Sequence, residues 1–181
     1  PAGFTEFDTA TDNADQILSG AGGRDIIFAG AGDDNIVFGE DLRANDRING
    51  GQGYDTLEID GAVNVVFGAN SLKSIEEISL PTLAGPGGHQ SIAMNDANVG
   101  AGKSLLVYAG QLDANTSFTF DGSAEADGSF QVLGGQGHDE SQLVMSTPSL
   151  SRLAALCTGH VSQLAWAAGT TGRRPAPLLV V

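Results

Sequence analysis

The sequence predicts an all-β solenoid, a stack of short parallel strands joined by tight turns. The first observation is a recurring pair in which an aspartate is followed two positions later by a branched aliphatic residue. The pairs are Asp15/Ile17, Asp25/Ile27, Asp34/Ile36, Asp46/Ile48 and Asp55/Leu57. The second is that β-prone runs continue further along the chain. The third is composition: aromatic residues make up only 6% and 26 of 181 residues are glycine, which favours thin aliphatic ladders between stacked coils.

Residues 1–58 form the first predicted unit, in which each repeat is half a coil. The best copy, Gly50-Gly51-Gln52-Gly53-Tyr54-Asp55-Thr56-Leu57-Glu58, has glycine at its first, second and fourth positions. Glycine lets the backbone turn sharply at positive φ. Such a bend aims carbonyl oxygens at one point, and the aspartate adds a negative charge there. Hard oxygen ligands, about six to eight of them, are what Ca²⁺ takes, so the turns are predicted calcium sites.

The repeats also predict which aspartates share an ion. Because two repeats make one coil, each aspartate is expected to face the one two repeats further on. This pairs Asp15 with Asp34, Asp34 with Asp55, and Asp25 with Asp46, giving up to three Ca²⁺ ions. The candidate metal-binding residues are Asp15, Gly20, Gly22, Asp25, Ala29, Gly30, Gly32, Asp34, Asp46, Gly50, Gly51, Gly53, Asp55 and, from a partial sixth copy, Asp139.

This pattern resembles the RTX, or hemolysin-type calcium-binding, repeat family of secreted bacterial proteins, most strongly over residues 10–58. The copies ending at Asp34 and Asp55 are close to the pattern, although Ala29 replaces the first glycine of one of them. The copy around Asp25 carries an extra residue upstream. The segment 38–45 is three residues too long, so a bulge is expected to leave the coil there.

The resemblance implies a parallel β-roll with two sheets of short strands. It also implies a secreted, extracellular or cell-surface location and export by type I secretion machinery, which reads a C-terminal signal. We expect a monomeric, non-enzymatic module of a larger protein that folds on binding extracellular calcium. Two alternatives stay open: the non-catalytic C-terminal region of a secreted protease or lipase, and a calcium-independent β-solenoid segment of an adhesin.

Residues 59–145 are predicted to extend the solenoid. Short β-prone runs alternate there with turn-forming residues. A small β-sandwich packed on the roll is the alternative. The runs are Val63–Phe67, Ile75–Leu80, Ser91–Met94, Ser104–Tyr108, Ser117–Phe120 and Ser129–Leu133. The partial sixth copy that ends at Asp139 has Ser141 where the aliphatic residue should stand.

Residues 146–181 are predicted to be an irregular or helical tail. They contain no acidic residue, and they hold the only Cys and Trp of the chain. Leucines at loosely helical spacing fit an export signal. The abrupt loss of acidity favours instead an end that is not native to the repeats, such as a frame-shifted or fusion-derived segment.

Charge and motifs exclude several function classes. All 22 acidic residues lie in residues 1–140 and the net charge is −14, so we expect neither nucleic acid nor anionic membranes as partners. No apolar run approaches the roughly 18 residues of a membrane helix, which argues against membrane insertion. Neither an H-E-x-x-H zinc motif nor a G-x-S-x-G elbow is present. The phosphate-loop-like stretch 97–104 precedes a strand rather than a helix, so it reads as a turn.

Overall fold

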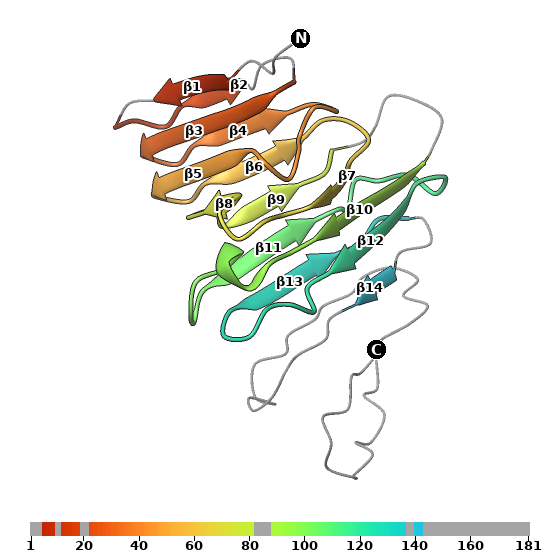
Figure 1. Cartoon of the computed structure of the whole chain (residues 1–181). Coiled ribbons are helices and arrows are strands. Elements are labelled where there is room, and N and C mark those ends of the chain that lie inside the picture. The colour runs from red at the N-terminus through yellow and green to blue at the C-terminus, as the bar shows by residue number, and fades with distance from the viewer. Residues whose placement is uncertain (1–4, 10–11, 19–21, 82–87, 137–139, 143–181) are drawn as a thin grey trace.

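The computed structural model describes residues 5–9, 12–18, 22–81, 88–136 and 140–142, which wind into a parallel β-solenoid (Figure 1). This confirms the predicted all-β class and the preference for further rungs over a separate sandwich. The predicted tail, 146–181, lies outside the described residues.

One wall of the solenoid is a single six-stranded parallel sheet, called the long sheet here. Every successive coil adds one strand to it, so it runs the whole length of the stack. Its strands in spatial order are β2 (Gln16–Leu18), β4 (Asn35–Phe38), β6 (Thr56–Ile59), β9 (Glu77–Ser79), β11 (Ser104–Tyr108) and β13 (Ser129–Leu133).

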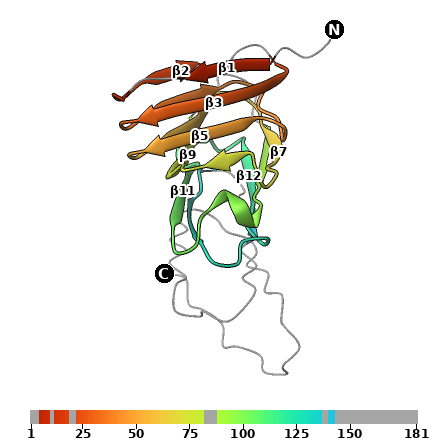
Figure 2. The same cartoon turned by 60° about the vertical axis from the view of Figure 1, so that its left-hand side comes forward.

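The opposite side is divided between two four-stranded sheets. The first short sheet contains β1 (Thr5–Thr9), β3 (Arg24–Ala31), β5 (Arg47–Gln52) and β8 (Leu72–Lys73). The second short sheet contains β7 (Asn64–Val66), β10 (His89–Ala93), β12 (Ser117–Asp121) and β14 (Glu140–Gln142). Figure 2 shows β11 and β12 on opposite walls of the later coils.

The change from one short sheet to the other happens within a single coil. Between β6 and β9 the chain passes through both β7, which pairs with β10, and β8, which pairs with β5. The next coil replaces a strand beside β8 with a 3₁₀ turn, η1 (Asp96–Asn98), whose Asn98 Nδ2 donates to the carbonyl of Gly68 at 2.9 Å. The first short sheet therefore ends at β8, and the long sheet is the only one of the three sheets that extends through both halves of the described stack.

The core is a set of aliphatic ladders, one residue per coil. Along the long sheet the register stacks Ile17, Ile36, Leu57, Ile78, Val107 and Val132. All of them are buried. Strand residues alternate between the core and solvent, which explains why the aliphatic residue two positions after each aspartate faces inward. Phe118, Phe120 and Phe130 thicken the core of the later coils, where Phe120 and Phe130 pack edge to face.

The predicted strand runs match the observed strands closely, and four elements were not foreseen. These are the first strand β1, the two-residue strand β8, the turn η1, and β14, which forms around Ser141 although an aliphatic residue is missing there. The overlong segment 38–45 is accommodated by turns between β4 and β5, with Leu42 buried.

Candidate metal sites

Three repeat aspartates stack along one edge of the long sheet. Asp15, Asp34 and Asp55 each directly precede a strand of that sheet, so the strand register superimposes them. The backbone N–H of Asp15 donates to Asp34 Oδ1 at 2.8 Å, and that of Asp34 donates to Asp55 Oδ1 at 3.0 Å. Each of these two carboxylates therefore lies against the aspartate one coil before it.

Glu76 extends this row, which sequence reasoning missed. The N–H of Asp55 donates to Glu76 Oε2 at 3.0 Å, and the separation of 21 residues equals that between Asp34 and Asp55. The signal was present, because Ile78 follows Glu76 at the same distance as an aliphatic residue follows each aspartate. Asp15, Asp34, Asp55 and Glu76 are together called the carboxylate ladder below.

Two carboxylates of the ladder are buried with one oxygen unsatisfied. Asp34 is 2% exposed and Asp55 is 0% exposed. In each, Oδ1 accepts the neighbouring N–H, while Oδ2 has no hydrogen-bond partner among the described residues. A buried charge without a partner costs several kcal/mol in general. Among the described residues, neither Asp34 nor Asp55 forms an ion pair with a lysine or arginine.

The glycines of these turns are required by space and by backbone conformation. Gly51 has φ +112° and lies over Gly30, so a side chain on Gly51 would overlap the Gly30 carbonyl oxygen. Gly53 and Gly32 are related in the same way, with φ +133° and +116°. Gly50 has no positive φ, but a side chain there would overlap the Asp55 carboxylate. The repeat's glycines thus let two turns stack closely and leave room for the carboxylate between them.

The comparisons with known proteins point to the same segment. Residues 11–41 and 43–58 match the model of the RTX calcium-binding nonapeptide repeat, in four copies. Residues 11–58 carry RTX repeats. Comparison with curated proteins and with solved structures gives no match. RTX repeats are calcium-binding structural modules and are generally non-catalytic.

The RTX repeats hold Asp55 in surroundings that oppose its ionisation. Burial raises the pKa of the Asp55 carboxyl, the hydrogen bond from the Asp34 backbone lowers it, and the charges of Asp34, Glu76 and Asp33 raise it again. The net direction is upward. The RTX turn therefore disfavours its own negative charge unless positive charge is supplied.

Tyr54, next to Asp55, is affected by the same acidic edge. Its hydroxyl donates to Glu77 Oε2 at 2.9 Å. Burial, this hydrogen bond and the charges of Glu77 and Glu76 raise the pKa of Tyr54 to about 12.

The opposite edge of the RTX segment carries a second aspartate pair with a different arrangement. The N–H of Asp25 donates to Asp46 Oδ1 at 3.0 Å, so these aspartates also stack. Asp46 Oδ2 accepts the N–H of Arg43 at 2.7 Å. Both oxygens of Asp46 thus accept hydrogen bonds from backbone N–H groups, and these bonds close the turn before β5. Gly22 (φ +70°) lies beside Asp41 in the neighbouring turn.

The remaining predicted ligands are placed as follows. Ala29 is fully buried within β3, immediately before Gly30. Gly20 and Asp139 lie outside the described residues. In the described part of the chain no helix is long and apolar enough to cross a bilayer.

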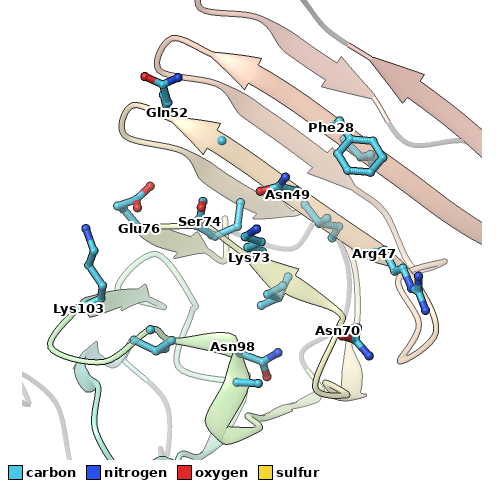
Figure 3. A pocket seen from close by; sticks show the side chains of 18 of the residues that line it. Phe28, Arg47, Asn49, Gln52, Asn70, Lys73, Ser74, Glu76, Asn98 and Lys103 are labelled. Carbon is cyan, nitrogen blue, oxygen red and sulfur yellow. The ribbon is translucent and has the colours of Figure 1, made fainter.

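A shallow groove of about 840 Å³ lies over the outer face of the first short sheet (Figure 3). Arg47, Lys73 and Lys103 line it, together with Phe28 and amide side chains. Figure 3 places Glu76 and Gln52 at one end of this groove. The basic side chains of this groove therefore lie on the same face as Glu76 of the carboxylate ladder, which lines the groove with them.

Proposed function

We propose that this chain is a calcium-binding RTX module that folds on binding extracellular calcium, as part of a secreted bacterial protein exported by a type I system. The observation that carries the proposal is the stacked pair Asp34 and Asp55, buried side by side with one unsatisfied oxygen each. RTX repeats typically occur in secreted bacterial proteins.

The residues present fit calcium. Asp34 and Asp55 offer hard carboxylate oxygens, and the glycine turns beside them bring backbone within reach, which matches the oxygen-rich shell that Ca²⁺ takes. Asp15 with Asp34, and Asp25 with Asp46, would hold the other two of up to three ions. Glu76 adds a carboxylate below Asp55. Calcium, when bound, supplies the positive charge that this edge lacks.

Free-energy magnitudes support the proposal that the ions are required for folding. Without them, buried like charges oppose closure of the turns, and aliphatic ladders with few aromatics offset little backbone entropy. A ligand present at about 100 times its Kd stabilises the folded state by about 2.7 kcal/mol per site. Three such sites would give roughly 8 kcal/mol, comparable with the roughly 5–15 kcal/mol total stability of a typical domain.

Circular dichroism of the full chain tests the proposal. In millimolar Ca²⁺ we expect a β spectrum and a cooperative melt, and with excess EGTA we expect loss of both. If EGTA changed neither the β signal nor the melting temperature, the result would instead favour a calcium-independent solenoid.

A pair of variants tests the assignment of ions to aspartates. Asp34→Asn should lower calcium affinity and melting temperature more than Asp25→Asn, because Asp34 stands in two of the three proposed pairs. Equal effects of the two substitutions would reject the pairing.

A further inference from the structure

A second group of carboxylates lies outside the RTX repeats, in the later coils. Asp96 is in η1, and Glu125 and Asp127 are in the turn between β12 and β13. One carboxylate oxygen from each of the three lies within 4.8 Å of those from the other two. The two segments are 30 residues apart in sequence and are joined by a hydrogen bond from the N–H of Ala126 to Asp96 Oδ1 at 2.7 Å.

Glu125 is buried and has an oxygen without a partner. Only 6% of the residue is exposed. Its Oε1 accepts three backbone N–H groups, from Ala126 and Asp127 at 3.1 Å each and from Gly128 at 2.6 Å. Its Oε2 is buried and accepts no hydrogen bond in the described structure. The three N–H groups fix the carboxylate in place and leave Oε2 as the oxygen that can face a ligand.

No basic side chain of the described residues forms an ion pair with this group. Lys103 lies on the adjacent turn, whose Gly102 N–H donates to the Asp127 carbonyl at 2.8 Å. The Lys103 side chain, however, extends into the groove over the first short sheet (Figure 3). Three carboxylates, one of them buried, thus converge without a cation from the chain. Converging hard oxygens of this kind favour Ca²⁺, whose coordination tolerates irregular geometry, over Mg²⁺, which requires a near-ideal octahedron.

We propose that Asp96, Glu125 and Asp127 form a separate calcium site, which ties η1 to the β12–β13 turn. Asp96 and Asp127, both exposed, add two further carboxylates to the buried Glu125, and water supplies the remaining ligands. The site lies where the first short sheet has ended, so it crosslinks two coils that the long sheet, the second short sheet and the hydrogen bonds between these turns also connect. It is independent of the nonapeptide pattern.

Counting bound calcium tests the site. The full chain is equilibrated with excess ⁴⁵Ca²⁺, and the bound ions are counted for wild type and for the double variant Asp96→Asn/Asp127→Asn. Both residues are exposed, and asparagine keeps the Oδ1 acceptor that Ala126 uses, so the fold should survive. The matched control is Glu40→Gln/Asp60→Asn, which removes two exposed carboxylates elsewhere. We expect one ion fewer in the Asp96/Asp127 variant and an unchanged number in the control.

Equal numbers in wild type and the Asp96/Asp127 variant would overturn the site, and so would an equal loss in the control, which would indicate diffuse counterions. The single variant Glu125→Gln, which retains the Oε1 acceptor, must lose the same ion. The RTX variant Asp34→Asn/Asp55→Asn separates this inference from the proposed function. In that background calcium should still shift the amide NMR signals of Asp127 and Gly128, and an absence of shifts would also reject the site.

Discussion

At the scale of single residues, glycine positions are the sharpest test of how closely the turns stack. Gly51→Ala places a methyl group against the Gly30 carbonyl at φ +112°. A residue held in such a conformation costs roughly 1–3 kcal/mol, and the overlap adds to this. We expect Gly51→Ala to lower the free energy of unfolding in calcium by at least about 2 kcal/mol, measured by urea denaturation.

Gly88→Ala is the matched control. An added Cβ at Gly88 meets nothing within 4 Å, and its φ is not positive. Its effect should stay within about 0.5 kcal/mol. Comparable losses in the two variants would mean that glycine content as such, rather than turn stacking, sets stability.

Asp55 should show opposite effects with and without calcium. Asp55→Asn removes a buried charge whose Oδ2 has no partner, so the calcium-free protein should gain roughly 1–3 kcal/mol in stability. In saturating calcium the same variant should be less stable than wild type, because a ligand is lost. Circular dichroism in excess EGTA and thermal melts in calcium check this: the variant should keep more β signal than wild type without calcium and melt at a lower temperature with it. A variant that is less folded in both conditions would show that Asp55 stabilises the fold independently of calcium.

The raised pKa of Asp55 gives the metal-free protein a defined pH dependence. Because the folded state favours the protonated carboxyl, its contribution to stability is fully present below the ordinary pKa of 3.8 and is lost as pH rises through the raised folded pKa. In excess EGTA the β signal should therefore increase as the pH is lowered from 7 toward 3.8. Asp55→Asn should reduce this increase, and a wild-type β signal that grows as the pH rises would contradict the assignment.

At the scale of elements, the ladder of the long sheet carries the packing energy. Leu57 is fully buried between Ile36 and Ile78. Leu57→Ala should lower the free energy of unfolding in calcium by about 2–5 kcal/mol. Each ladder holds one core residue per coil, so the neighbouring side chains cannot fill the cavity that the substitution leaves. Leu18, also on the long sheet but 67% exposed, is the control. Leu18→Ala should leave the free energy of unfolding, measured by urea denaturation, almost unchanged. A loss equal to that of Leu57→Ala would contradict the assignment of the inward face of the long sheet as the core.

The strands of the RTX segment could be predicted because each repeat contains the residues that determine its local structure. The aspartate fixes the turn, the glycines permit it, and the aliphatic residue two positions later fixes the inward face. The later strands could be predicted from β-prone runs alone, since a strand of a parallel solenoid needs little more than residues that alternate between core and solvent. The stacking of Asp15, Asp34 and Asp55 followed from the coil length.

Other features depend on contacts that no local pattern encodes. Glu76 was missed because a glutamate replaces the aspartate and no glycine turn precedes it. The two-residue strand β8 and the turn η1 arise where one coil reaches two sheets, which depends on tertiary register. The meeting of Asp96 with Glu125 and Asp127 depends on two turns far apart in sequence lying side by side. Strand registers, not motifs, determine such meetings.

At the scale of the whole molecule, the long sheet is the only wall that is continuous from the RTX repeats to the last described coils. The first short sheet ends at β8 and the second begins at β7. In a solenoid each coil contacts mainly its neighbours, so stability approximates a sum of local terms and nearest-neighbour terms. Calcium bound at the RTX turns should accordingly stabilise the later coils through the coil that contains β8 and β9, which pair with β5 and β6.

Hydrogen exchange in calcium tests how far that coupling reaches. In Asp34→Asn/Asp55→Asn, which lacks two members of the carboxylate ladder, amide protection should fall most in β4 and β6, less in β9, and least in β11 and β13. The gradient is expected because opening of the first coils breaks only one interface with the rest of the stack. The variant Asp96→Asn/Asp127→Asn should show the reverse order, with the largest loss around η1 and the β12–β13 turn. A uniform loss of protection in either variant would mean that the described coils unfold as one cooperative unit, and that calcium at one end controls the whole stack.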